Sequence, residues 1–325
     1  MRQSSNTKTL TPTSNRAGHL HTLKGLYVID GAMATELERR GADLNHALWS
    51  ARVLAEQPAL IEAVHYDYFI AGADIATTAS YQATFAGFAR CGMDASRSRE
   101  LLQLSVQLAC DARDRFWAES GNRAHRRYPL VAAAIGPYGA HLHDGSEYTG
   151  NYGADKSALA DFHRRQLEVL ARSDADLIAF ETVPSRHEAE AVMLLLEEFP
   201  EQRAWISFSC RSPTEVSHGE SFRDCIAMAG DSPQVLAAGL NCTAPEFVAL
   251  LLASAAPQAA KPLLAYPNSG EKWQAVDNSW SGGSSIDDIA VQARSWRAAG
   301  ASLVGGCCRT TPAHIRRIAR ALRDG

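Results

Sequence analysis

Eight short apolar runs mark this chain, and stretches with helical spacing separate them. The runs are mostly continuously apolar rather than alternating, which is typical of parallel strands buried on both faces. Leu60, Val64 and Tyr68 show the helical spacing after the first run. The runs are Leu26–Met33, Asp74–Tyr81, Pro129–Tyr138, Asp176–Pro184, Ala204–Cys210, Ala237–Cys242, Pro262–Gly270 and Leu303–Cys308.

A strand followed by a helix, repeated eight times, predicts a single-domain α/β protein with a (β/α)8 TIM barrel. A doubly wound open sheet is the alternative. Residues 1–24 are rich in Ser, Thr, Asn and basic residues, so we predict a flexible N-terminal tail before a barrel domain at 25–325. The extra length follows expected strand ends, where a barrel builds its active site. It lies in residues 31–58, 81–99, 136–156 and 267–285.

Composition narrows the class of partner. The formal net charge is -4 and the pI is near 6.3, so no broad basic field favours nucleic acid. The apolar runs are far shorter than the roughly 20 residues that cross a bilayer, so we expect no membrane partner. The chain has seven cysteines, and three of them cluster at strand ends. This distribution favours a reducing, cytoplasmic location over a disulfide framework.

The three clustered cysteines are the strongest chemical signal. Cys242 closes one apolar run, and Cys307 and Cys308 close the last. Parallel strands of a barrel end on the same face, so three thiols there predict a zinc ion with an open fourth position, as in catalytic sites. Adjacent cysteines require a backbone bend, and we expect the preceding Gly305 and Gly306 to allow it. Two unrelated buried thiols and a vicinal disulfide are the alternatives.

The remaining cysteines and two histidines receive simpler interpretations. Neither His141 nor His143 is predicted to bind metal, because two histidines in a glycine-containing loop are more often exposed to solvent. Arg309 follows the cysteine pair and either pairs with a carboxylate or caps the last strand. The other cysteines are predicted to be packing or surface residues: Cys91, Cys110, Cys210 and Cys225.

Polar residues at other strand ends are expected to share the same pocket. Glu181 follows an apolar run, and an unpaired buried carboxylate is unfavourable unless it has a function. Asp30 is equally well explained as a turn or helix cap. Three thiolates on zinc carry a net charge of -1, and this excess favours reactions in which a substrate thiolate attacks an electrophilic carbon. The residues of this group are Asp30, Thr78, Ser80, Glu181, Asn241, Cys242, Tyr266, Asn268, Cys307 and Cys308.

Seven motifs in order from about residue 25 to the C-terminus carry a family resemblance. They are Asp30–Leu37, Thr78–Gln82, Gly136–Gly139, Glu181–Pro184, Asn241–Cys242, Tyr266–Glu271 and Gly305–Thr310. With these motifs the chain resembles the homocysteine S-methyltransferase family. It is most similar to the branch that uses S-methylmethionine and works without cobalamin.

The resemblance implies a zinc-dependent barrel. Cys242, Cys307 and Cys308 would bind one Zn²⁺ per chain, and the homocysteine thiolate would take the fourth position. Asp30 and Glu181 would hold the substrate ammonium group. The rest of the amino-acid portion would contact backbone amides at Gly31 and Ala32, and the side chains of Thr78, Ser80 and Asn241.

The implied methyl donor is a sulfonium, which suits aromatic faces. The aromatic residues proposed for it are Trp49, Tyr81, Tyr266, Trp273 and Trp280. The predicted reaction transfers a methyl group from S-methyl-L-methionine, or less readily from S-adenosylmethionine, to L-homocysteine. Betaine-dependent methylation of homocysteine is the nearest alternative. A non-catalytic zinc-binding or thiol-redox protein is the alternative from another class.

Overall fold

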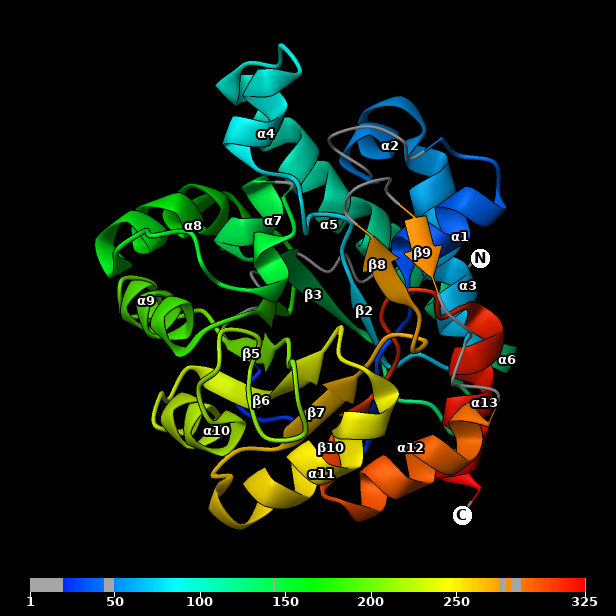
Figure 1. Ribbon diagram of the computed structural model, residues 1–325. Coiled ribbons are helices and arrows are strands. Elements are labelled where there is room, and N and C mark those ends of the chain that lie inside the picture. The colour runs from blue at the N-terminus through cyan, green and yellow to red at the C-terminus, as the bar shows by residue number, and fades with distance from the viewer. Residues whose placement is uncertain (1–19, 44–49, 143, 275–278, 282–287, 325) are drawn as a thin grey trace, which may run out of the picture.

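Eight parallel strands form one closed barrel in the computed structural model, which describes residues 20–43, 50–142, 144–274, 279–281 and 288–324 (Figure 1). The sheet order is β1-β10-β7-β6-β5-β4-β3-β2, and a parallel bridge between Ile29 and Ile75 joins its two edges. Each predicted apolar run overlaps one strand, so the (β/α)8 barrel is confirmed, although β6 and β10 begin two residues before their runs. The strands are β1 Tyr27–Val28, β2 Ile75–Thr77, β3 Leu130–Ile135, β4 Leu177–Val183, β5 Ala204–Phe208, β6 Val235–Asn241, β7 Leu263–Tyr266 and β10 Ala301–Val304.

Helices follow every strand and surround the barrel (Figure 1). The helical spacing at Leu60, Val64 and Tyr68 falls within α3, as predicted. The helices are α1 Met33–Arg39, α2 Ser50–Glu56, α3 Pro58–Ala71, α4 Phe85–Arg90, α5 Ala95–Ala118, α6 Ser120–Arg123, α7 Tyr138–Leu142, α8 Lys156–Leu170, α9 Arg186–Glu197, α10 Phe222–Gly230, α11 Pro245–Ala255, α12 Ile289–Ala298 and α13 Pro312–Arg323, with short 3-10 turns η2 Ser146–Tyr148 and η3 Ala256–Gln258.

The barrel strands are buried on both faces, which explains their continuous apolar sequences. Inward residues such as Leu177, Ala179 and Trp205 belong to a cluster that fills the barrel interior. Their neighbours Ile178 and Ile206 belong to the larger cluster between strands and helices. Because successive strand residues point to opposite faces, both sets must be apolar.

Two segments outside the predicted pattern also have defined structure. An antiparallel hairpin of β8 Lys272–Gln274 and β9 Ser279–Ser281 follows β7, where the sequence predicted only a long loop. Leu23 is fully buried in the barrel-interior cluster, so packed chain extends at least back to Leu23. The tail and domain boundaries remain predictions, because residues 1–19 lie outside the described part of the chain.

The starts of α11 and α13 differ in their capping. Thr311 is the N-cap of α13, and its backbone N–H donates to Nδ1 of His314 at 3.1 Å. The N-cap of α11 is Ala244, and Thr243 instead donates its hydroxyl to the carbonyl of Asn241 at 2.9 Å.

Within the described residues, no helix is long and apolar enough to cross a membrane.

Candidate metal centre and substrate pocket

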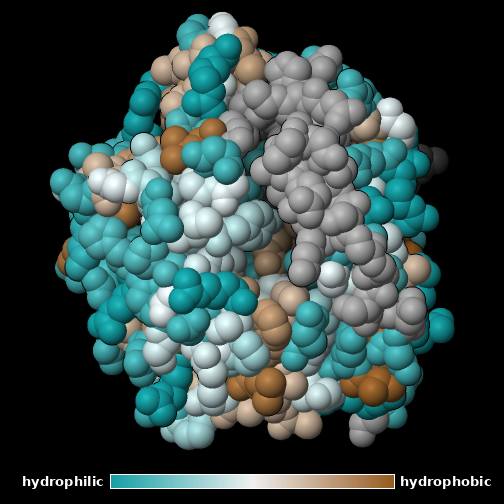
Figure 2. All heavy atoms as spheres, viewed as in Figure 1, coloured by the Kyte–Doolittle hydropathy of each residue, from teal (hydrophilic) through white to brown (hydrophobic). Residues whose placement is uncertain are grey.

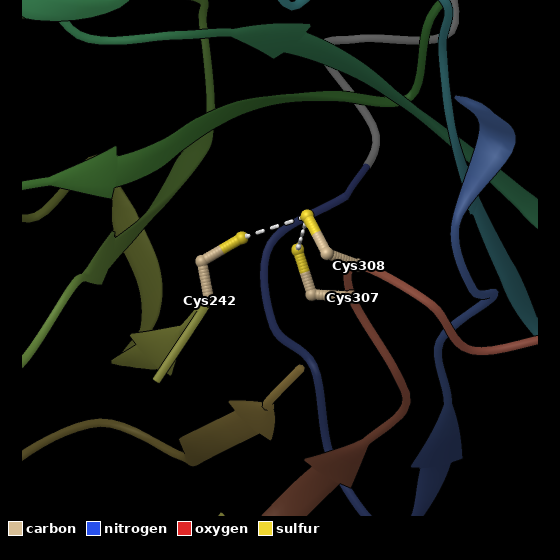
Figure 3. A group of neighbouring side chains, drawn as sticks. All are labelled: Cys242, Cys307 and Cys308. Atoms are coloured by element: carbon tan, nitrogen blue, oxygen red, sulfur yellow. Dashed lines mark hydrogen bonds between the residues drawn. The ribbon is translucent and has the colours of Figure 1, made fainter. Parts of the chain in front are cut away.

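Three cysteine thiols meet at the ends of β6 and β10 and point toward one another (Figure 3). Sγ of Cys308 lies 3.6 Å from Sγ of Cys242 and 4.0 Å from Sγ of Cys307. All three sulfurs lie within 4.8 Å of one another. Tetrahedral zinc with Zn–S bonds of about 2.3 Å places its sulfur ligands about 3.8 Å apart. The described cysteines therefore fit the ligand spacing of a zinc ion and leave one position for another ligand.

A turn that begins at Cys307 brings the adjacent cysteines to one side. The backbone N–H of Thr310 donates to the Cys307 carbonyl at 3.1 Å, and Arg309 has a positive φ of 65°. Neither Gly305 nor Gly306 has a positive φ, so the expectation that they supply unusual backbone freedom is wrong. A Cβ on Gly306 would lie 2.4 Å from Oγ1 of Thr310. Gly306 is therefore required for space beneath the cysteine turn, and Gly305 for space beside Ile29, where a Cβ would lie 2.7 Å from the Ile29 carbonyl oxygen.

The cysteines form one wall of a cavity of ≈ 170 Å³, which is large enough for a small amino acid rather than an ion alone. Figure 2 shows a hollow with apolar residues near the centre of this face of the molecule. No lysine, arginine or histidine lines the cavity in the described part of the chain. Predicted residues in the lining are Gly31, Thr78, Tyr81, Glu181, Asn241, Cys242, Tyr266, Cys307 and Cys308.

Without a metal, the cluster favours neutral thiols over thiolates. A hydrogen bond to Cys242 and burial raise the pKa of the Cys308 thiol well above its usual value. Three thiolates would therefore not form together in this place without a positive charge. A divalent ion supplies that charge, because a coordinating thiol is deprotonated.

Glu181 lies at the end of β4 with only 7% of its surface exposed, and its Oε1 accepts a hydrogen bond from the Tyr266 hydroxyl at 3.0 Å. Trp205 in turn donates its indole N–H to the Tyr266 oxygen at 3.2 Å. Burial raises the pKa of Glu181 to about 7, and the Tyr266 hydrogen bond partly opposes the rise. This carboxyl group is poised to ionise when a cationic ligand enters.

Asp30 and Ser80 lie beside the cavity and not in its lining, as far as the described residues show. Asp30 accepts hydrogen bonds from the backbone N–H and hydroxyl of Thr77, and burial raises its pKa. Ser80 donates to the Ala134 carbonyl at 2.7 Å and contacts the hydroxyl of Thr78 at 2.6 Å. Ser80 therefore supports Thr78, which does line the cavity.

Asn241 links the carboxylate side of the cavity to the metal side. Its Oδ1 accepts from the Thr182 backbone N–H at 2.7 Å, and its Nδ2 donates to the Thr182 hydroxyl at 2.8 Å. The same Nδ2 lies 3.9 Å from Sγ of Cys307 as a donor. These bonds fix Thr182, whose φ is 59°, and orient Cys307. The Ala32 amide proposed for a carboxylate already donates to Oγ1 of Thr310.

The lining also contains residues that the sequence did not single out, and two of these are Glu147 and Tyr148. They occupy η2 in the loop after β3, which the sequence marked by its length alone. Burial, reinforced by nearby Cys242 and Cys308, raises the pKa of Tyr148 well above its usual range. Tyr148 therefore lies close to the thiols. The loop sequence contains no motif that would have identified Glu147 or Tyr148 as cavity residues.

The other predictions have mixed outcomes. Arg309 pairs with a carboxylate, since its Nε lies 2.9 Å from Oε2 of Glu271. His141 is partly exposed and packs against Arg90 and Phe162, so it is less exposed than expected, and it is not a member of the metal cluster. The four remaining cysteines are free, and all but Cys91 are buried, in agreement with packing roles. Trp49 and His143 lie outside the described part of the chain. The side chains of Trp273 and Trp280 also lie outside it.

Comparison with known proteins agrees with this geometry. A family model described as homocysteine S-methyltransferase matches residues 27–322. The homocysteine S-methyltransferase YbgG of Bacillus subtilis is 47% identical, with 95% of this chain and 98% of the relative covered. Homocysteine S-methyltransferase 4 of Zea mays is 47% identical, with 94% and 92% covered.

A solved structure gives the same result in three dimensions. The metallated form of the homocysteine methyltransferase MmuM from Escherichia coli superposes with a TM-score of 0.82 at 45% identity. The match covers 91% of this chain and 96% of that one. This chain belongs to the homocysteine S-methyltransferase family of enzymes.

Proposed function

We propose that this enzyme transfers a methyl group from S-methyl-L-methionine to L-homocysteine and produces two molecules of L-methionine. The observation that carries the proposal is the set of three thiols at tetrahedral spacing in the wall of a cavity that also contains Glu181. The names of the relatives at 47% identity support homocysteine as the acceptor. S-Adenosylmethionine is proposed as a weaker donor.

Cys242, Cys307 and Cys308 are proposed to hold one Zn²⁺. When bound there, zinc would supply a positive charge that keeps a substrate sulfur deprotonated at neutral pH. Cobalamin has no role in this proposal, because both partners in the transfer are small sulfur compounds that meet directly. A reducing cytoplasm is the proposed location, since free thiols persist there.

Acceptor binding is assigned to cavity residues near the cysteines. Glu181 is proposed to accept a hydrogen bond from the homocysteine ammonium group, and Asp30, which lies within electrostatic range of Glu181, is proposed to assist it. Tyr266 donates to Glu181 and so fixes the direction in which its carboxylate faces. Thr78 and the backbone at Gly31 line the same region and are proposed to contact the substrate's amino-acid portion. Asn241 acts as a positioning residue for Cys307 and Thr182.

The transfer needs no further reactant. The homocysteine thiol loses its proton to solvent, and its sulfur then attacks the methyl carbon of the sulfonium. A new carbon–sulfur bond forms while the donor's methyl–sulfur bond breaks, and that electron pair remains on the donor sulfur as a neutral thioether. The protein's contribution is mainly to align the two sulfurs and the methyl carbon, which is an effective means of lowering a bimolecular barrier.

A donor comparison tests the proposal. Zinc-loaded protein is mixed with L-homocysteine and with S-methylmethionine, S-adenosylmethionine or betaine separately, and methionine is measured. We expect the fastest formation with S-methylmethionine, its loss in Cys308→Ala, and its retention in Cys91→Ala, a half-buried thiol outside the cavity lining. Activity with betaine alone would overturn the donor assignment, and no methionine from any donor would overturn the proposed reaction.

A further inference from the structure

Glu147 is a second carboxylate in the cavity, and no side chain of the described residues forms a hydrogen bond with its Oε2. It lines the cavity, and its Oε2 is buried without a hydrogen-bond partner among the described residues. No lysine or arginine of the described chain forms an ion pair with it. A buried carboxylate oxygen without a partner is unfavourable, and a ligand bound in the cavity would supply the missing partner.

The backbone that carries Glu147 is held firmly in place. A Cβ on Gly139 would lie 2.4 Å from the Glu147 amide nitrogen, so α7 and η2 are in direct contact. Glu188 on α9 anchors both ends of the loop: it accepts from the Tyr138 amide at 2.6 Å and from the Tyr152 hydroxyl. Glu147 is therefore presented to the cavity by a fixed loop, as a recognition group must be.

The surroundings of Glu147 match those of a cation site near the thiols. Tyr148, the next residue, lies within electrostatic range of Cys242 and Cys308. Tyr81 also lines the cavity and lies within range of both Glu147 and Cys242. Aromatic rings and a carboxylate together suit an organic cation. Burial raises the pKa of Glu147, and an approaching positive charge would favour the ionised form again.

We propose, on the basis of the methyl transfer proposed above, that Glu147 binds a positive charge of the methyl donor and selects for cationic donors. Glu181 is already assigned to the acceptor's ammonium group, so the donor's charge needs a different partner. S-Methylmethionine offers two sources of that charge, its sulfonium and its α-ammonium group. Both present the same chemistry to a carboxylate.

The test is the neutral, nearly isosteric variant Glu147→Gln, measured at saturating homocysteine. We expect the KM for S-methylmethionine to rise on the order of 10- to 100-fold, the loss expected for a hydrogen bond to a charged group. The KM for homocysteine and the zinc content should not change. Glu147→Asp, which keeps the charge, should recover most of the donor affinity.

Asp144→Asn is the matched control, because it removes a negative charge from the same loop at an exposed position outside the cavity lining. Its oxygen can still accept from the Ser146 amide, so η2 should keep its structure. Its donor KM should remain that of the wild type. Calorimetric titration of S-methylmethionine into each metal-free protein gives a second readout that does not depend on turnover.

The two charge sources are separated with 4-(dimethylsulfonio)butanoate, the donor analogue without an amino group. A penalty for Glu147→Gln with both donors supports the proposal and assigns the sulfonium. A penalty with S-methylmethionine alone supports it and assigns the ammonium group. An unchanged donor KM, or a rise confined to homocysteine, would overturn it. Failure of the wild type to form methionine would instead overturn the proposed function.

Discussion

Glu181→Gln separates acceptor recognition from protein stability. The substitution keeps the size of the side chain and an oxygen that accepts the Tyr266 hydroxyl, and it removes the negative charge. Two unit charges about 4 Å apart attract by about 4 kcal/mol at an effective dielectric constant of about 20. Loss of that attraction predicts a decrease of about 100- to 1000-fold in kcat/KM for L-homocysteine.

The same variant should not be less stable than the wild type. The pKa of Glu181 rises from 4.5 to about 7 on folding because burial disfavours the charge. A group with a raised pKa in the folded state contributes its stability below pH 4.5 and loses it as the pH rises through about 7. At pH 8 the buried charge therefore costs the metal-free protein about 3 kcal/mol, which the neutral glutamine avoids. Urea unfolding at pH 8 measures this difference.

A second acceptor completes the experiment. 4-Mercaptobutanoate has the thiol and carboxylate of homocysteine but no ammonium group, so Glu181→Gln should react with it as well as the wild type does. Methionine and 4-(methylthio)butanoate formation are measured by chromatography at saturating donor. If the variant lost the same factor with both acceptors, Glu181 would not recognise the ammonium group and the assignment would be refuted.

Three further predictions concern the frame around the site. Gly239→Ala places a Cβ 1.9 Å from the Leu264 carbonyl oxygen and should lower the free energy of unfolding by about 3 kcal/mol. The control Gly121→Ala, whose Cβ would have no atom within 4 Å, should change that free energy by less than about 1 kcal/mol. Urea titrations measure both. His65 is buried with no hydrogen-bond partner among the described residues, and burial lowers its pKa from 6.5 to about 3, so stability is lost as the pH falls below 6.5. His65→Leu should unfold at a lower pH by circular dichroism, and an unchanged acid midpoint would contradict this. Glu188→Ala should lower kcat/KM for the donor about 10-fold and leave the zinc content intact, because it releases both ends of the loop.

The barrel could be predicted because the burial of each strand on both faces determines the residue types in that strand alone. Strands buried on both faces must be continuously apolar, and Leu177 to Phe180 or Leu263 to Ala265 have that character. The helical spacing of Leu60, Val64 and Tyr68 likewise located α3. The β8–β9 hairpin was not predicted, since its three-residue strands are too short to show an alternating pattern.

The site was predictable only where strand ends determine position. Cys242 and Cys307 follow strands of one parallel barrel and Glu181 lies near the end of another, so their meeting follows from the topology. The direction of a side chain within such a group depends on hydrogen bonds that the sequence does not show. Ser80 turns to the Ala134 carbonyl for this reason. Glu147 comes from a long loop, and only the packed structure brings it to the cavity.

Zinc X-ray absorption spectroscopy tests the central claim most directly, namely that three cysteines hold zinc with one position open for the acceptor sulfur. Zinc-loaded protein is measured alone and with L-homocysteine. For the protein alone we predict three sulfur ligands and one lighter ligand. After homocysteine is added we predict four sulfur ligands, each at a Zn–S distance of about 2.3 Å. Cys308→Ala should lose one sulfur in both states. An unchanged sulfur count on addition of homocysteine would contradict the account.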